Sequence, residues 1–371
     1  MNFKEKLLSP VTTPEFTLLN RIIMAPMSRR RSEKGVPGES VAIYYGQRAS
    51  AGLIITENSA VSPNGIGYLN APGIYNIAQK EAWKRVVGEV HNKNGKIFVQ
   101  LVHTGRIGHH LNNENGEHLV APSAITARLN TRTALDRAVP MPVPHPLTTS
   151  GARDHIEAHI QAARDAIEIG FDGVEIHGAH GFLPEQFMHP YTNHRTDQYG
   201  GSIANRSRFL LEIMEGVIGA IGKDRTGIRL SPFAALNDLP PYAEEATTHQ
   251  YITVALQQMD ILYLHLSDAS QHRYPSIPFE FVQDVRKRFS NMLILAGGFT
   301  ADFAEATLQA GLADLIAFGR PFIANPDLVE RFRENIPLAI GNTNTYYEGG
   351  DTGYIDYPAA YHDPSPCRVA V

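Results

Sequence analysis

The feature that most constrains the fold is a set of eight short apolar runs along the chain, most of them separated by stretches of helical periodicity. Within each run the hydrophobicity is continuous rather than alternating, and turn-forming residues follow its C-terminal end. Strands that are buried on both faces, as in a parallel sheet, require this pattern. The expected strands are residues 21–25, 53–57, 96–101, 173–177, 226–231, 261–266, 292–297 and 315–319.

Helices are expected between the strands, and several carry end signals. Asp154 is positioned to cap the helix that Gly170 closes, and Thr300 to cap a later one. The β-then-α alternation predicts the α/β class and a single (β/α)8 TIM barrel over residues 1–371, with a doubly wound open sheet as the alternative. The expected helices are residues 78–91, 154–169, 205–221, 243–259, 279–289, 301–310 and 326–334.

Two regions depart from this alternation. Residues 105–151 are polar and proline-rich, and they are too long for a simple connector after the third strand. We interpret them as an excursion, or lid, over the barrel mouth. The tail from Gly341 onward, rich in glycine and tyrosine, is interpreted as an ordered C-terminal extension.

Composition excludes several classes of protein. The 371 residues are 43% hydrophobic and 19% charged with a formal net charge of -5, which provides no basic surface for nucleic acid. Cys367 is the single cysteine, so redox chemistry would need a cofactor rather than a disulfide or a CxxC motif. The charged N-terminus and the lack of a long apolar run predict a cytoplasmic protein that does not interact with membranes.

In such barrels the functional residues lie at the C-terminal ends of the strands, and phosphate groups bind after strands seven and eight. These two ends carry the glycines and the cation that a phosphate needs: Gly297, Gly298, Gly319 and Arg320. The alternative is that the glycines only form tight turns.

Polar residues also occur at the other strand ends, where barrel packing does not require them: Ser28, Glu57, Asn58, Gln100, His103, His177, His180 and Arg229. Gln100 and Arg229 stand within apolar runs, where an amide or a cation is costly without a partner. A planar heterocycle would satisfy Gln100, and an anionic or electron-rich group would satisfy Arg229. An ion pair between Arg229 and Glu175 is the alternative.

His177 and His180 are three residues apart, so that both rings could face one point. They could polarise a single substrate oxygen. A two-histidine metal site is the alternative, but no third ligand lies at short spacing, so no metal is expected.

Several long segments resemble the Old Yellow Enzyme family. They extend over most of the chain: residues 20–28, 44–57, 100–106, 170–177, 193–202, 317–320, 323–328 and 353–358. The resemblance implies an enzyme that binds FMN non-covalently and uses NADPH or NADH to reduce an electron-poor small molecule.

The resemblance also assigns roles to residues. It implies that Gly297, Gly298, Gly319 and Arg320 bind the flavin phosphate, and that His177 and His180 hold the oxygen of an enone or nitro group. Around the flavin ring it places Pro26, Met27, Ser28, Ala60, Gln100 and Arg229.

Two positions depart from the family pattern. Val102 replaces the usual tryptophan, which should enlarge the substrate pocket, and Phe182 replaces the tyrosine that protonates the substrate carbon. Water, Tyr68 or Tyr347 would have to deliver that proton. Alkene reduction is therefore expected to be slow relative to nitro compounds, nitrate esters and quinones, whose heteroatoms exchange protons with water.

The alternatives are a flavin-free phosphate-handling barrel, such as an aldolase or isomerase, and a flavin-binding ligand binder or redox sensor with weak turnover. Either a monomer or a homodimer is compatible with the sequence.

Overall fold

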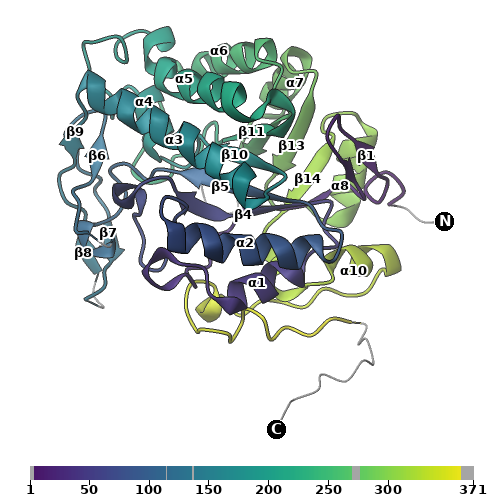
Figure 1. Cartoon of the computed structure of the whole chain (residues 1–371). Coiled ribbons are helices and arrows are strands. Elements are labelled where there is room, and N and C mark those ends of the chain that lie inside the picture. The colour runs from purple at the N-terminus through teal and green to yellow at the C-terminus, as the bar shows by residue number, and fades with distance from the viewer. Residues whose placement is uncertain (1–3, 114, 136–137, 270–275, 361–371) are drawn as a thin grey trace.

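Eight parallel strands close on themselves in the computed structural model, which describes residues 4–360 except 114, 136–137 and 270–275 (Figure 1). Around the barrel the order is β10, β11, β12, β13, β14, β3, β4 and β5. The strands are β3 (Ile22–Met24), β4 (Leu53–Ala60), β5 (Ile97–Val102), β10 (Gly173–His177), β11 (Thr226–Leu230), β12 (Tyr263–Ser267), β13 (Met292–Ala296) and β14 (Leu315–Phe318).

The last strand pairs with the first, which distinguishes a closed barrel from an open sheet. Ile316 of β14 lies opposite Ile22 of β3, and Phe318 lies opposite Met24. The predicted (β/α)8 barrel is therefore confirmed, and the open doubly wound sheet is wrong. The barrel strands are almost wholly buried, as their continuous hydrophobicity predicted.

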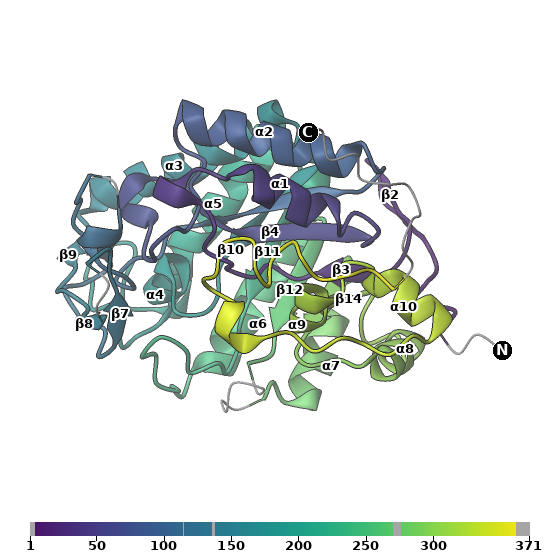
Figure 2. The same cartoon turned by 90° about the horizontal axis from the view of Figure 1, so that it is seen from below.

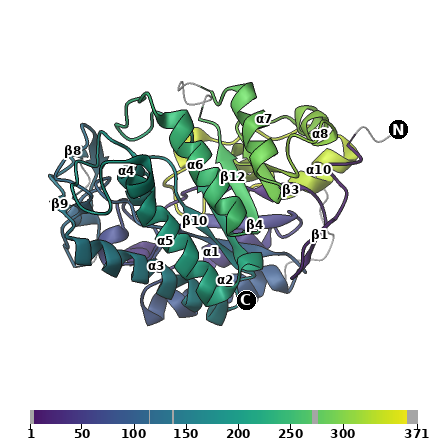
Figure 3. The ribbon, with the colours of Figure 1, turned by 90° about the horizontal axis from the view of Figure 1, so that it is seen from above.

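Helices cover the outside of the barrel, and Figure 3 shows α3, α5, α6 and α7 following one another around it. The helices are α1 (Glu39–Gly46), α2 (Ile77–His91), α3 (Thr149–Ile169), α4 (Leu183–Met188), α5 (Ile203–Ile221), α6 (Glu245–Gln258), α7 (Phe279–Arg288), α8 (Ala301–Gln309), α9 (Arg320–Ala324) and α10 (Leu328–Glu334). Short 3-10 helices occur at Glu33–Gly35, Pro63–Gly65, His110–Asn112, Lys223–Arg225 and Thr343–Thr345.

The end signals of the helices were only partly interpreted correctly. The cap of helix α3 lies six residues before the expected one, because Thr148, not Asp154, accepts the hydrogen bond from the Gly151 N–H. Gly170 ends α3 in the left-handed conformation, with φ 112°, as predicted. Thr300 caps α8 by accepting from the Phe303 N–H, also as predicted.

Three two-stranded sheets lie outside the barrel: β1 (Val11–Thr12) with β2 (Thr17–Leu18), β6 (Val120–Ala121) with β9 (His145–Pro146), and β7 (Asn130–Arg132) with β8 (Ala138–Pro140). The last two belong to the excursion and gather on one side of the barrel (Figure 1). Within the excursion, Ala127 and Met141 pack against Val102 and Phe182 from the barrel. A lid function for this segment stays a prediction.

The C-terminal extension is fastened to the loop that follows β3. Arg29 donates hydrogen bonds to the carbonyls of Tyr346 and Gly353. Arg31 donates to a second set of tail carbonyls, those of Thr345, Tyr346, Glu348 and Gly350. The extension then returns to α1, where Gln47 donates to the Ile355 carbonyl, and Figure 2 shows it alongside α10.

None of the helices in the described part of the chain is both long and apolar enough to cross a membrane. Cys367 lies outside the described residues.

Candidate functional site

The C-terminal ends of three adjacent strands bring the candidate catalytic groups together. His177 ends β10 and lies opposite Arg229 of β11 in the strand register. Ser267 ends β12, and its hydroxyl accepts a hydrogen bond from Arg229 Nη2 at 2.9 Å. A histidine, an arginine and a serine therefore meet at one rim of the barrel.

His177 is held as a neutral imidazole with one defined tautomer. Burial, reinforced by the charges of Arg229 and His265, lowers the pKa of His177 well below its usual value. Its Nδ1 accepts a hydrogen bond from the Ala179 N–H at 3.3 Å. A neutral imidazole that accepts on one nitrogen carries its proton on the other, so we assign the proton to Nε2. His177 can therefore donate a hydrogen bond from Nε2.

His180 stands in a constrained loop directly after β10. Its backbone is left-handed, with φ 58°, which is uncommon for a residue with a side chain. Ser231 Oγ accepts from the His180 N–H at 2.8 Å, and Asn237 donates to the His180 carbonyl at 2.7 Å. The His180 Nε2 lies 3.0 Å from Ser267 Oγ, which fixes the ring.

The two imidazoles meet as the spacing predicted, with ring centroids 5.3 Å apart and planes inclined at 76°. Among the described residues, no group of three or more histidine, cysteine or acidic side chains could hold a metal ion.

Glu175, the alternative partner of Arg229, does not satisfy its hydrogen-bond donors. The two oxygens of Glu175 are occupied by Gln100 Nε2 at 2.7 Å and by His265 Nδ1 at 2.8 Å. Arg229 Nε is buried and has no hydrogen-bond partner among the described residues. Burial lowers the pKa of Arg229 to about 10, because the charged form is poorly solvated. The strand therefore presents a cation that lacks a full set of partners.

The first two strands place the other candidate cofactor residues at the same barrel end. Pro26, Met27 and Ser28 follow β3, and Ser28 Oγ accepts from Asn58 Nδ2 at 3.3 Å. Ala60 ends β4 and is buried.

The glycine-rich ends of the last two strands adopt the conformations for which glycine is required. Gly297 and Gly298 have φ values of 152° and 71°, and a Cβ on Gly297 would lie 2.5 Å from Asp268 Cβ. A tight turn is thus one reason for these glycines, and it does not exclude a phosphate. Gly319 precedes α9, and the adjacent Arg320 is exposed, with no ion pair to another described residue.

A row of aromatic rings extends outward from the histidine pair. Phe182 is buried with its ring centroid 4.8 Å from His177, and the Tyr68 ring follows at 6.4 Å from Phe182. Val102 belongs to the same apolar cluster as Phe182 and Tyr68. Tyr347, in the C-terminal extension, is 55% exposed and contacts the same Arg30 guanidinium as Tyr68.

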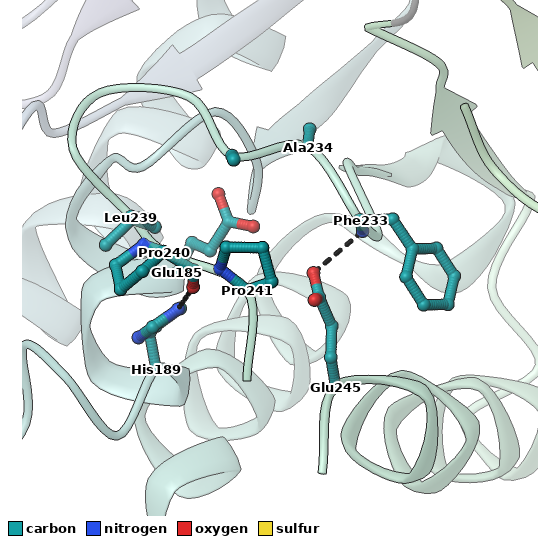
Figure 4. Close-up of a pocket in the computed structure, with 9 residues that line it drawn as sticks. Glu185, His189, Phe233, Ala234, Leu239, Pro240, Pro241 and Glu245 are labelled. Carbon is teal, nitrogen blue, oxygen red and sulfur yellow. Dashed lines mark hydrogen bonds between the residues drawn. The ribbon is translucent and has the colours of Figure 1, made fainter. Parts of the chain in front are cut away.

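Glu185 forms hydrogen bonds that hold the loop containing His180. Its carboxyl accepts from the Gly181 N–H at 2.5 Å and from Ser231 Oγ at 3.3 Å. A cavity of about 10 Å³, enough for one water, lies beside it, and Figure 4 shows the carboxyls of Glu185 and Glu245 next to the loop that carries Ala234. Burial raises the pKa of Glu185 to about 8.

Several of these residues were not singled out from the sequence. The predicted sixth strand ended at Leu266, one residue before Ser267. Ser231 was included only as the end of a strand, and Glu185 and Asn237 lie in segments without a recognisable motif. The run Arg29-Arg30-Arg31, three cations in a loop directly after the first strand, was a signal that could have been used.

Comparisons with known proteins agree with this geometry. Residues 6–339 match the model of the NADH:flavin oxidoreductase / NADH oxidase family. The chain is 40% identical to 12-oxophytodienoate reductase 7 of Oryza sativa subsp. japonica over 372 residues, covering 95% of this chain and 94% of the relative.

Solved structures show the same similarity. Morphinone reductase in complex with tetrahydroNAD superposes with a TM-score of 0.91 at 42% identity, covering 97% of this chain and 99% of that chain. The old yellow enzyme homologue from Zymomonas mobilis gives a TM-score of 0.90 at 39% identity, covering 95% and 99%. This chain therefore belongs to the NADH:flavin oxidoreductase / NADH oxidase family, that of the Old Yellow Enzymes, and is an oxidoreductase that uses FMN with NADH or NADPH.

Proposed function

We propose that this enzyme reduces electron-poor alkenes conjugated to a carbonyl group, as well as nitro compounds, nitrate esters and quinones. The substrate oxygen lies between His177 and His180. Relatives named for the reduction of 12-oxophytodienoate and morphinone support the enone class. The observation that carries the proposal is the neutral His177. Its Nε2 donor has no hydrogen-bond partner among the described residues, and it lies beside a second imidazole and a buried arginine.

The residues at the barrel mouth fit a flavin. The unpartnered Nε of Arg229 offers a hydrogen bond and a positive charge to an electron-rich ring. The exposed Arg320 beside Gly319 offers a cation to a phosphate. We therefore propose that Pro26, Met27, Ser28, Ala60, Gln100 and Arg229 surround the ring, and that Gly297, Gly298, Gly319 and Arg320 hold the phosphate.

When bound at these residues, FMN would supply hydride chemistry, with NADPH or NADH as the source of the hydride. The protein stabilises the negative charge that develops on the substrate oxygen, and the Nε2–H of His177 is a preorganised donor for that charge. Ser267 fixes the His180 ring beside it. Because burial keeps His177 neutral, its Nδ1 remains an acceptor for the Ala179 N–H and its Nε2 carries the single ring proton.

Removal of this donor tests the proposal. Wild type and His177→Ala are each titrated anaerobically with NADPH and then mixed with cyclohexenone, while flavin absorbance is followed. We expect NADPH to bleach the flavin in both proteins, but reoxidation by cyclohexenone to be on the order of 100-fold slower in the variant. His177→Asn, which restores an N–H donor, should recover part of the rate, and His118→Ala in the excursion should match wild type.

Equal reoxidation rates in His177→Ala and wild type would contradict the role of His177. A flavin that NADPH reduces but that neither cyclohexenone nor nitrobenzene reoxidises would favour the second candidate, a ligand binder or redox sensor. The observation in favour of that candidate is Phe182, whose buried ring has no proton to donate.

A further inference from the structure

We propose that Arg30 forms an anion-binding position at the outer end of the aromatic row and selects molecules that carry a carboxylate or phosphate group. The inference rests on the proposed function, because it assumes that the reacting end of the molecule lies at the histidine pair. It concerns a different part of the site, the end that faces the extension.

The Arg30 guanidinium contacts two tyrosine rings. Its central carbon is 4.6 Å from the Tyr68 centroid and 5.0 Å from the Tyr347 centroid. Stacking of this kind orients a guanidinium through its faces, while its N–H donors lie in its plane. The in-plane donors therefore remain available to a third group.

Arg30 also differs from its two neighbours because no described residue accepts a hydrogen bond from its side chain. Arg29 and Arg31 are each bound to backbone carbonyls of the extension. Arg30 Nε, in contrast, is buried without a hydrogen-bond partner among the described residues. Ion pairs near the mouth join Arg132 to Glu348 and Arg106 to Asp238, and no described carboxylate pairs with Arg30.

The backbone holds Arg30 in an unfavourable conformation. Its φ is 56°, in the left-handed region that residues with side chains rarely adopt. The buried carboxylate of Glu57 stabilises this turn by accepting from the N–H groups of Arg29 and Arg30, at 3.0 and 3.2 Å. A strained conformation persists only where its surroundings fix it, so the direction of this side chain is built into the loop.

The aromatic row connects Arg30 to the histidine pair. Tyr68 contacts both Arg30 and Phe182, and Phe182 contacts His177. An elongated molecule whose carbonyl lies at His177 would follow these rings outward and meet the guanidinium. An anionic group at its far end would supply the acceptor that Arg30 lacks. That group belongs either to the electron acceptor or to the 2′-phosphate of NADPH.

The test compares charged and neutral molecules of the same shape. The FMN-loaded enzyme is titrated with cinnamaldehyde and with para-carboxycinnamaldehyde in the absence of a hydride donor, and dissociation constants are read from flavin absorbance. KM values for NADPH and NADH are measured separately. The binding measurement needs no turnover, so a failure of the proposed reductase activity would be distinguishable from a failure of this inference.

The main variant is Arg30→Met, which removes the charge and keeps an unbranched apolar chain beside the rings. We expect it to weaken binding of the carboxylated aldehyde by about ten- to a hundredfold, with little change for cinnamaldehyde, if the anion is on the acceptor. If the anion is the phosphate of NADPH, the KM for NADPH should rise while the KM for NADH stays constant. Either preference should fall with rising ionic strength.

Two further variants separate charge from packing. Arg30→Lys keeps the charge without the planar stack and should retain part of the preference, also as a salt-dependent effect. Arg164→Met removes one charge from an exposed pair with Glu157 on α3 and should leave all four constants unchanged. If Arg30 only fastened the Tyr347 ring, Arg30→Met would change charged and neutral molecules equally, and that result would overturn the inference.

Discussion

Phe182 is the residue at which the sequence predicts the clearest chemical departure from the family pattern. Its ring is buried and lies edge-on to His177, with a centroid distance of 4.8 Å. Tyrosine would add only a hydroxyl at the far edge of the ring. The sequence resemblance implies that this hydroxyl is the usual acid.

Phe182→Tyr is therefore expected to accelerate reoxidation by cyclohexenone on the order of 100-fold, the usual contribution of a positioned acid. Nitrobenzene should change by only about a few-fold, because its heteroatoms take protons from water. Single-turnover reoxidation of the reduced flavin measures both. Similar accelerations for the two acceptors would contradict a missing acid as the cause.

The phenols near Phe182 provide the matching control. If Tyr68 or Tyr347 already supplies the proton, Tyr68→Phe or Tyr347→Phe should slow cyclohexenone selectively in the wild-type background. Burial raises the pKa of Tyr68, so its hydroxyl stays protonated. Tyr347 is exposed, and a proton from it would have to reach the site from the extension.

At the scale of elements, the barrel strands could be predicted because burial on both faces leaves a pattern that depends on no partner. Helix α1 could not, because it has no amphipathic pattern. Its residues Val41, Ala42, Tyr44 and Tyr45 are all buried, and Tyr44 stacks on Tyr354 of the extension. A short segment of sequence does not reveal long-range contacts of this kind.

Some residues of the candidate site could likewise be recognised in the sequence, and others could not. Arg229 and Gln100 were recognisable because polar residues are costly in apolar strands. Ser267 and Ser231 were not, because a serine at a strand end is common and only the tertiary contacts to Arg229 and His180 reveal its purpose. Asp154 was mistaken for a helix cap because a helix of 21 residues extends past it into a segment that looked irregular.

The loop between β10 and α4 is stabilised by a buried carboxyl whose ionisation should affect stability. The pKa of Glu185 is raised by burial from 4.5 to about 8, so the folded protein keeps a proton that the unfolded chain releases. The resulting stability is fully present below the unfolded pKa and is lost as pH rises through about 8. Between these values the slope is about 1.4 kcal/mol per pH unit.

Glu185→Gln removes this titration and keeps the shape of the side chain. Urea unfolding of the FMN-loaded proteins should show that wild type loses stability relative to the variant between about pH 5 and pH 8, and that the difference levels off above. Glu157→Gln, on the exposed face of α3, should show the same pH dependence of the free energy of unfolding as wild type. If Glu185→Gln also had the same pH dependence of unfolding as wild type, the pKa of Glu185 would not be raised in the folded protein.

For the whole molecule, the proposed flavin site should affect the stability of the barrel. A ligand that binds only the folded state stabilises it by about 2.7 kcal/mol at a hundred times its dissociation constant. Removal of FMN should therefore lower the melting temperature by several degrees, and added FMN should restore it. The residues proposed for the site lie in or shortly after β3, β4, β5, β11, β13 and β14, so the effect should extend to the entire closed sheet.

Variants of Arg229 and Arg320 test separately the proposed contacts to the flavin ring and to its phosphate. Arg229→Met removes a buried cation with an unpartnered Nε, so the flavin-free protein should be no less stable, while the increment from FMN shrinks. Arg320→Ala should reduce the increment from FMN to that from riboflavin, which has no phosphate. Scanning calorimetry with each flavin measures these increments. If wild type gained equally from riboflavin and FMN, no phosphate contact would be stabilising the fold, and Arg320 would be only a surface residue.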